Sequence, residues 1–152
     1  MHKRLLFLIP CFVIAVPAFL SAQTAADEIE TLLNTQAVTY GQAARFILEA
    51  SEASVTADPS AAFQYAADRN WLPKNVSETD TARLDGIALL VMCSFDIKGG
   101  LWYSIAKNPH FAYRELVYQD IIQGRIDPAM AVSGDALLYM TGRVFSQREE
   151  GN

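Results

Sequence analysis

The chain has 152 residues, of which 51% are hydrophobic, and a formal charge of −5 from 12 basic and 17 acidic residues. This length suits one domain with a single core. No basic cluster follows the first few residues, which argues against nucleic acid or an anionic membrane surface as a partner, because such binding depends on clustered Lys and Arg.

The N-terminus has the order of a secretory signal peptide. Lys3 and Arg4 precede an uninterrupted apolar run over residues 5–20, which is short for a membrane span of roughly 20 residues. We predict that residues 1–22 are a signal peptide cleaved after Ala22, with Ala18 as the alternative cleavage site. The expected product is exported to the periplasm or the cell envelope and surface, with no stable membrane span.

Cleavage would also change the counts of reactive residues. Without Lys3 and Arg4, 10 basic residues face 17 acidic ones, a formal charge of −7, and Cys93 and His110 become the sole cysteine and histidine. An intrachain disulfide is then impossible, and a structural zinc site, which needs four such ligands, is excluded. We therefore expect no metal and no cofactor, and a fold held by apolar packing.

The first half of the mature chain shows helical spacing. Residues 26–33 form a short amphipathic segment, and Thr39 with Gln42 fits a capping box that opens a second helix. Asp58-Pro59 is a typical helix entry, with an acid at the cap and proline in the first turn. That third helix is expected to end near Asn70.

The second half continues the helical pattern. An apolar helix is expected over about residues 80–95, a short segment over 101–108, a helix over 109–122 terminated by Gly124, and a last helix from Ser133 to about Phe145. No Asn-Gly hairpin signal occurs. The predicted fold is all-α, a compact bundle of six or seven helices over residues 23–147 with a polar tail at 148–152.

An internal repeat organises this bundle. Residues 62–95 align without gaps on residues 112–145, an offset of 50, and both windows contain an amphipathic helix, a loop of about ten residues and a more apolar helix. Residues 38–48 match the start of the last helix as an abbreviated third copy. Repeated helix pairs bury their faces against neighbouring copies, so we expect two full units and one abbreviated unit packed together.

The repeat unit resembles the S-layer homology repeat, in which a helix leads to an Ile-Ile-x-Gly turn, a loop ending in Pro, and a Thr-Arg-Ala-Glu-like helix entry. Ile121-Ile122-Gln123-Gly124 to Pro128, followed by Val132-Ser133-Gly134-Asp135, has that order. Ala82-Arg83-Leu84-Asp85 and Thr39-Tyr40-Gly41-Gln42 stand at the entries of the other copies. The resemblance covers roughly residues 38–145.

The resemblance implies that the chain binds an envelope glycan attached to peptidoglycan, with Arg83 and Asp85 as binding residues. The chain departs from the repeat pattern in three ways. Only Arg83 keeps the arginine of the entry motif, the first copy is short, and residues 96–110 form an insertion. A divergent module with a different envelope ligand, such as an envelope protein, is the alternative.

The insertion and the helix start that follows it hold the densest group of polar and aromatic residues. Adjacent glycines allow close approach to the backbone, aromatic rings offer flat faces for sugars, and arginine can hold a carboxylate with two hydrogen bonds. The alternative is structural: the glycines cap a helix and the aromatic residues cover the core. The candidate ligand-binding residues here are Asp96, Lys98, Gly99, Gly100, Trp102, Tyr103, His110 and Arg114.

Two enzymatic interpretations are less favoured. Cys93 and His110 resemble a thiol nucleophile and its base, but Cys93 lies in an apolar helix, where cysteine is usually an unreactive core residue. Glu115 with Asp120 or Asp85 offers carboxylates for hydrolysis of wall polymers, but their spacing singles out no pair. We therefore predict a non-catalytic envelope module that binds a cell-wall glycan or another envelope component. The alternatives are a periplasmic protein–protein adaptor using residues 96–115 and, third, a cell-wall hydrolase.

Overall fold

A computed structural model describes residues 26–124 and 126–150. The predicted signal peptide and its cleavage sites lie outside these residues. Two units are distinguished, residues 1–31 and 32–152. In the first, the described residues 26–31 are helical, and Thr31 Oγ1 donates a hydrogen bond to the Asp27 carbonyl at 2.8 Å.

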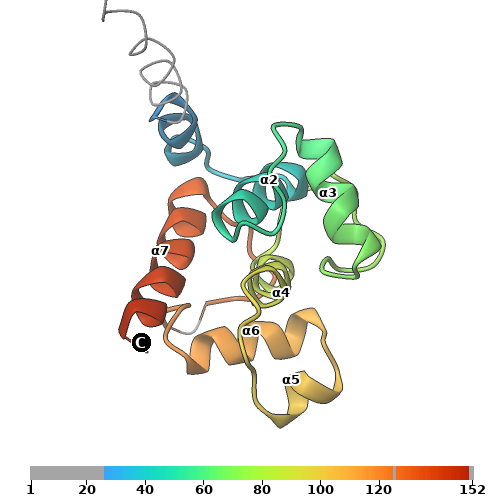
Figure 1. The fold of residues 1–152 in the computed structure, drawn as a ribbon, viewed down its shortest axis with the longest axis vertical. Coiled ribbons are helices and arrows are strands. Elements are labelled where there is room, and N and C mark those ends of the chain that lie inside the picture. The colour runs from blue at the N-terminus through green and yellow to red at the C-terminus, as the bar shows by residue number, and fades with distance from the viewer. Residues whose placement is uncertain (1–25, 125, 151–152) are drawn as a thin grey trace, which may run out of the picture. The chain divides into compact units, whose positions relative to one another are not determined.

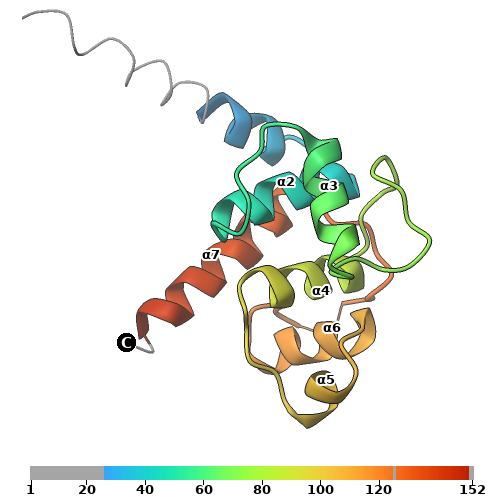
Figure 2. The same ribbon diagram turned by 45° about the vertical axis from the view of Figure 1, so that its right-hand side comes forward.

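The described residues are all-helical, as predicted, and contain no strand (Figure 1). A first helix covers 26–33, and the others are α2 (Tyr40–Ala50), α3 (Pro59–Asp68), α4 (Leu84–Ser94), α5 (Leu101–Ile105), α6 (Pro109–Tyr118) and α7 (Gly134–Glu150). The apolar α4 packs against α2 and α6, while α3 packs on α2 and α5 on α6 (Figure 2). Eight of its residues are buried, so α4 is the centre of the core.

Helix starts follow the local signals in the sequence. Thr39 and Gln42 form the predicted capping box of α2. Asp58 caps α3 before Pro59, and Asn108 caps α6 before Pro109, one repeat offset of 50 later in the chain. The chain leaves α3 and α6 through Asn70 and Asp120, both with φ near +57°. The predicted repeat is therefore present in backbone geometry and extends back to the helix caps.

The three copies meet in a closed ring of backbone hydrogen bonds, here called the junction ring. The Val38 amide donates to the Val132 carbonyl at 2.9 Å, the Val132 amide to the Ala82 carbonyl at 3.0 Å, and the Ala82 amide to the Val38 carbonyl at 2.8 Å. All three residues are buried. Each lies just before α2, α4 or α7, so the junction ring brings the three equivalent helix starts together.

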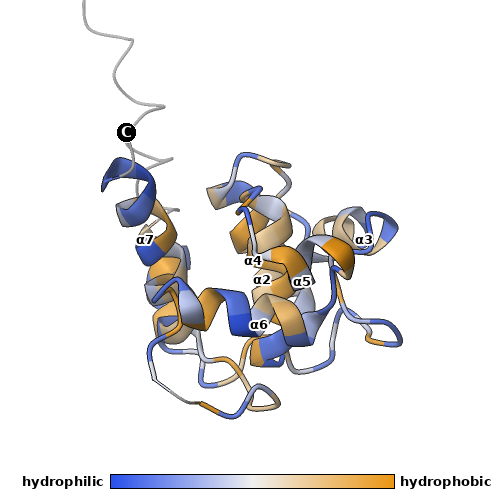
Figure 3. Ribbon diagram, turned by 90° about the horizontal axis from the view of Figure 1, so that it is seen from below, coloured by the Kyte–Doolittle hydropathy of each residue, from blue (hydrophilic) through white to orange (hydrophobic). Residues whose placement is uncertain are grey.

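Three predicted boundaries are wrong. Residues before Leu84 are not helical, because Arg83 pairs with Ala131 in an antiparallel bridge and the Leu84 amide donates to the Met130 carbonyl. The turn after α6 occurs at Asp120 rather than Gly124. The last helix continues to Glu150 rather than ending near Phe145, so most of the predicted polar tail is helical. Its last turns are polar (Figure 3).

Candidate functional site

The insertion after α4 is tied to α6 by two polar side chains. Glu115 Oε2 accepts a hydrogen bond from the Gly100 amide at 2.9 Å, and Gln119 donates to Glu115 Oε1 and to the Lys98 carbonyl, each at 2.9 Å. At Gly99, a Cβ atom would lie 2.5 Å from Tyr103 Cδ1, so only glycine fits. These hydrogen bonds and the close packing at Gly99 restrain the loop that leads into α5.

The short helix α5 has a buried side and an exposed apolar side. Tyr103 is 4% exposed, and its hydroxyl lies 3.4 Å from Cys93 Sγ. On the outside, Leu101, Trp102 and Ile105 are 71%, 68% and 70% exposed. These three side chains are here called the α5 surface, and Figure 3 shows the apolar colour on α5.

Aromatic rings of α6 continue the α5 surface. The Trp102 ring stacks on Phe111 with centroids 6.5 Å apart and planes 21° apart. The exposed His110 ring meets the same Phe111 edge-on at 5.6 Å. Phe111 therefore packs against both Trp102 and His110, and it supports the exposed indole ring.

Exposed cations lie in the same part of the chain as the α5 surface. Lys98 and Lys107 flank α5 in the chain, and Arg114 lies on α6 beside Glu115, which binds the Gly100 amide. Residues 98–114 contain these three cations and no acid. Lys98 contacts Asp96 at 3.3 Å, with both side chains more than 85% exposed. Such an exposed pair contributes little to stability.

The structure divides the predicted site residues into two groups. Six of them, Lys98, Gly99, Gly100, Trp102, His110 and Arg114, lie in or around α5 and the start of α6. Asp96 lies in the same loop, next to α4. Tyr103 is also on α5, but its burial against Cys93 makes it a core residue rather than a ligand-binding one. Leu101 and Ile105 were not predicted as site residues, but they belong to the exposed face. No local signal separates them from buried apolar residues, because α5 has only five residues.

Arg83 and Asp85 stand apart, at the start of α4. Arg83 Nη2 lies 2.8 Å from Asp85 Oδ2, and the Arg83 amide donates to the Tyr40 hydroxyl at 3.4 Å. Asp85 Oδ1 is buried and has no hydrogen-bond partner among the described residues. Burial raises the pKa of Tyr40. The two motif residues are thus paired with each other beside the junction ring.

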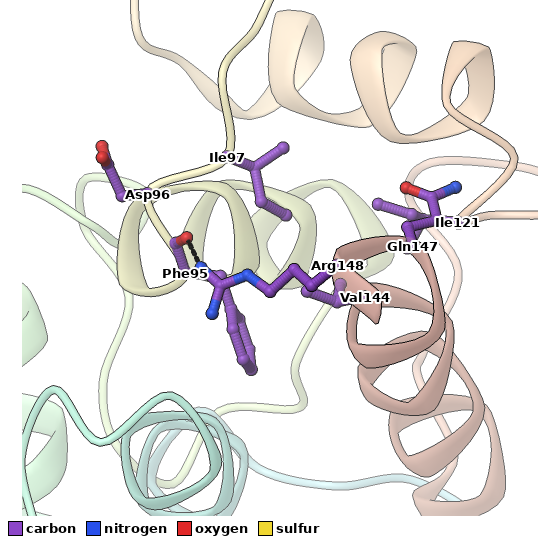
Figure 4. A pocket seen from close by; sticks show the side chains of 7 residues that line it. All are labelled: Phe95, Asp96, Ile97, Ile121, Val144, Gln147 and Arg148. Atoms are coloured by element: carbon purple, nitrogen blue, oxygen red, sulfur yellow. Dashed lines mark hydrogen bonds between the residues drawn. The ribbon is translucent and has the colours of Figure 1, made fainter. Parts of the chain in front are cut away.

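A small cavity of about 200 Å³ lies between the end of α4 and the last turns of α7 (Figure 4). Arg148 crosses it, donates to the Phe95 carbonyl, and holds its guanidinium carbon 5.3 Å from the Phe95 ring centroid. Arg148 thereby caps the end of α4. The cavity is lined by Phe95, Asp96, Ile97, Ile121, Val144, Gln147 and Arg148.

The residues considered for catalysis have structural partners. Burial raises the pKa of the Cys93 thiol, and its hydrogen-bond partner is Tyr103. Both Glu115 oxygens accept hydrogen bonds, and Asp85 pairs with Arg83. Within residues 26–124 and 126–150, no cluster of three or more His, Cys, Asp or Glu could hold a metal ion.

Comparisons with protein-family models, curated proteins and solved structures gave no significant match to this chain. Among the helices in the described part of the chain, none has the length and apolar character needed to span a membrane.

Proposed function

We propose that this protein is a non-catalytic binding module of the bacterial cell envelope, and that it engages its partner through the α5 surface. The envelope location follows from the basic and apolar order of residues 3–20, which is typical of an export signal. The S-layer homology resemblance remains a prediction, and it is consistent with an envelope role.

The observation that carries the proposal is the exposure of three large apolar side chains on one five-residue helix. Leu101, Trp102 and Ile105 are each about 70% exposed, although the same helix buries Tyr103. Contiguous apolar surface in water is unfavourable and marks interaction sites on soluble domains. Because Glu115, Gln119 and Gly99 hold the loop, the α5 surface is preorganised, which lowers the entropic cost of binding.

The structure offers less support for binding through the repeat motif. Arg83, whose side chain is 53% exposed, is already paired with Asp85. The aromatic residue that contacts its amide, Tyr40, is 1% exposed and offers no open ring face for a sugar. In contrast, the α5 surface contains the exposed indole ring of Trp102, which stacks on Phe111. We therefore place binding through residues 96–115 ahead of glycan binding at Arg83 and Asp85.

The test is sedimentation of the purified chain beginning at Gln23 with envelopes of the source bacterium, separated into membranes and peptidoglycan sacculi. The core residues that the structure describes lie between Val38 and Val144, so this chain retains them all. Wild-type protein should sediment with one fraction, and a Leu101→Ser/Trp102→Ser/Ile105→Ser variant should not.

Val55→Ser is the matched control, because Val55 is 80% exposed in the loop between α2 and α3. It should sediment like wild type. The proposal fails if the triple variant sediments as well as wild type, or if wild type sediments with neither fraction. If Arg83→Ala loses binding to sacculi while the triple variant keeps it, the binding site is the S-layer-type motif at Arg83 and not the α5 surface.

A further inference from the structure

We infer that the partner of the α5 surface is an anionic phospholipid bilayer, on which Leu101, Trp102 and Ile105 insert at the headgroup boundary while the surrounding cations contact lipid phosphates. This inference rests on the proposed function, since it names the partner of the same surface. The sequence alone argued against an anionic membrane surface as a partner, because no basic residues cluster along the chain.

Charge complementarity is the first support. The three cations around α5 are Lys98, Lys107 and Arg114, and no acid lies between residues 98 and 114. The rest of the chain carries 9 basic and 17 acidic residues. Arg114 is distant from Lys98 in sequence, but α5 packs on α6 and the Gly100 amide binds Glu115. Folding therefore brings the helix that carries Arg114 against the helix that carries the apolar surface, in a protein that is acidic overall.

Two acids border this segment, so residues 96–115 carry three basic and two acidic residues, a net charge of +1. Glu115 is turned toward the loop, where it accepts hydrogen bonds from the Gly100 amide and from Gln119. Asp96 pairs with Lys98 alone. Lys107 and Arg114 have no acidic partner within the described ranges. Basic residues around an apolar patch are the pattern by which peripheral proteins bind anionic lipid.

The size and residue types of the α5 surface favour a bilayer over a folded protein. From their exposed fractions, the three side chains present roughly 400 Å² of apolar surface, about half of the 800 Å² that one partner buries in a standard protein interface. A fluid bilayer needs no complementary groove. Trp at the interface, with aliphatic side chains beside it and Lys and Arg at the rim, matches the chemistry of the headgroup region.

The test uses the chain beginning at Gln23 with vesicles of phosphatidylcholine alone or of phosphatidylcholine mixed with phosphatidylglycerol. The protein should sediment with the mixed vesicles only, and added salt should release it. Lys107→Gln and Arg114→Gln should each weaken binding about fivefold, because one basic residue near an anionic surface contributes about that factor. Leu101→Ser/Ile105→Ser should weaken binding to the same vesicles.

Two controls match these variants. Lys74→Gln removes an exposed cation from the loop after α3, and Tyr118→Ser removes an 84% exposed aromatic ring from α6. Both should bind like wild type. The inference is overturned if wild type does not bind mixed vesicles, or if Lys74→Gln weakens binding as much as Lys107→Gln.

Binding to native membranes of the source bacterium distinguishes a failure of this inference from a failure of the proposed function. If wild type binds native membranes, but not protein-free vesicles of their extracted lipids, the partner is a membrane protein; the lipid inference then falls and the α5 surface stands. If the triple variant binds native membranes as wild type does, the proposed function itself falls.

Discussion

The amide of Val38 donates a hydrogen bond to the carbonyl of Val132, and this contact joins the first repeat copy directly to the last. Ala82 completes the junction ring with a donor and an acceptor of its own. None of the three residues is more than 2% exposed, so water does not substitute for a lost partner. An unpaired buried backbone group costs free energy comparable to a lost hydrogen bond.

Ala82→Pro should therefore destabilise the fold. Proline removes the amide that donates to the Val38 carbonyl, and the unpaired carbonyl alone should cost about 1–3 kcal/mol. Urea unfolding followed by circular dichroism measures the loss. Ala82→Gly keeps the amide and should cost less; equal losses for the two variants would show that the hydrogen bond is not the source.

The caps of α3 and α6 should have matching energies. Asp58 accepts from the Ser60 and Ala61 amides, and Asn108 accepts from the Phe111 amide. Asp58→Ala and Asn108→Ala should each lower the free energy of unfolding by about 1 kcal/mol. Exchange of one capping residue for the other, as in Asp58→Asn, should be nearly neutral, and a large loss in that variant would contradict a capping role.

Two glycines should respond to alanine in opposite directions. A Cβ at Gly86 in α4 would lie 2.5 Å from the Tyr40 hydroxyl and 2.9 Å from Pro73 Cγ. Gly86→Ala should thus cost about 1–3 kcal/mol through overpacking. At Gly142 in α7 nothing lies within 4 Å, and alanine should stabilise the helix by about 0.5–1 kcal/mol. Thermal unfolding of both variants checks the signs.

Asp80 should make stability depend on acid pH. The Ser77 amide donates to Asp80 Oδ2 at 2.7 Å, and this backbone hydrogen bond, with a second from the Ser77 hydroxyl, lowers the pKa of Asp80 below 3.8. A folded-state pKa below the unfolded value means that stabilisation is present above pH 3.8 and disappears as pH falls through the lowered folded pKa.

Asp80→Asn should therefore differ from wild type in unfolding free energy near neutral pH, and the difference should shrink as pH falls below 3.8. Urea titrations at a series of pH values measure it. Asp68→Asn is the control, because its exposed carboxylate makes no hydrogen bond within the described ranges, and it should leave the unfolding free energy near neutral pH unchanged. A difference independent of pH would assign the effect to structure rather than charge.

Local chemistry made much of the fold predictable. Thr39 and Gln42 satisfy amides at the start of α2, and Asp58 satisfies those of Ser60 and Ala61 in α3. These contacts span at most three residues, so sequence alone was sufficient. The start of α4 was not predictable in this way. Arg83 makes no side-chain cap, and the Leu84 and Asp85 amides are satisfied by carbonyls of Met130 and Pro128 from the next copy. Such long-range partners leave no local pattern.

The position of the candidate site in the chain was predictable, but the orientation of its side chains was not. The Gly99-Gly100 pair and its aromatic neighbours correctly marked the insertion as unusual. A five-residue helix has no periodicity that shows which side is buried, so Tyr103 and Trp102 were grouped together although only Trp102 is exposed. Likewise, Arg148 was assigned to a polar tail because its partner, the carbonyl of Phe95 directly after α4, is distant in sequence.

The junction ring also limits how this architecture can evolve. In an open array of helical repeats, each unit contacts only its neighbours, so units can be gained or lost at the ends. Here the third copy bonds back to the first, which closes the array at three members. Deleting one copy would leave an unpaired backbone amide on one remaining copy and an unpaired carbonyl on the other. The number of copies is consequently constrained, because each copy needs a backbone donor and an acceptor from the other two. For the same reason, the three copies should unfold in one cooperative transition.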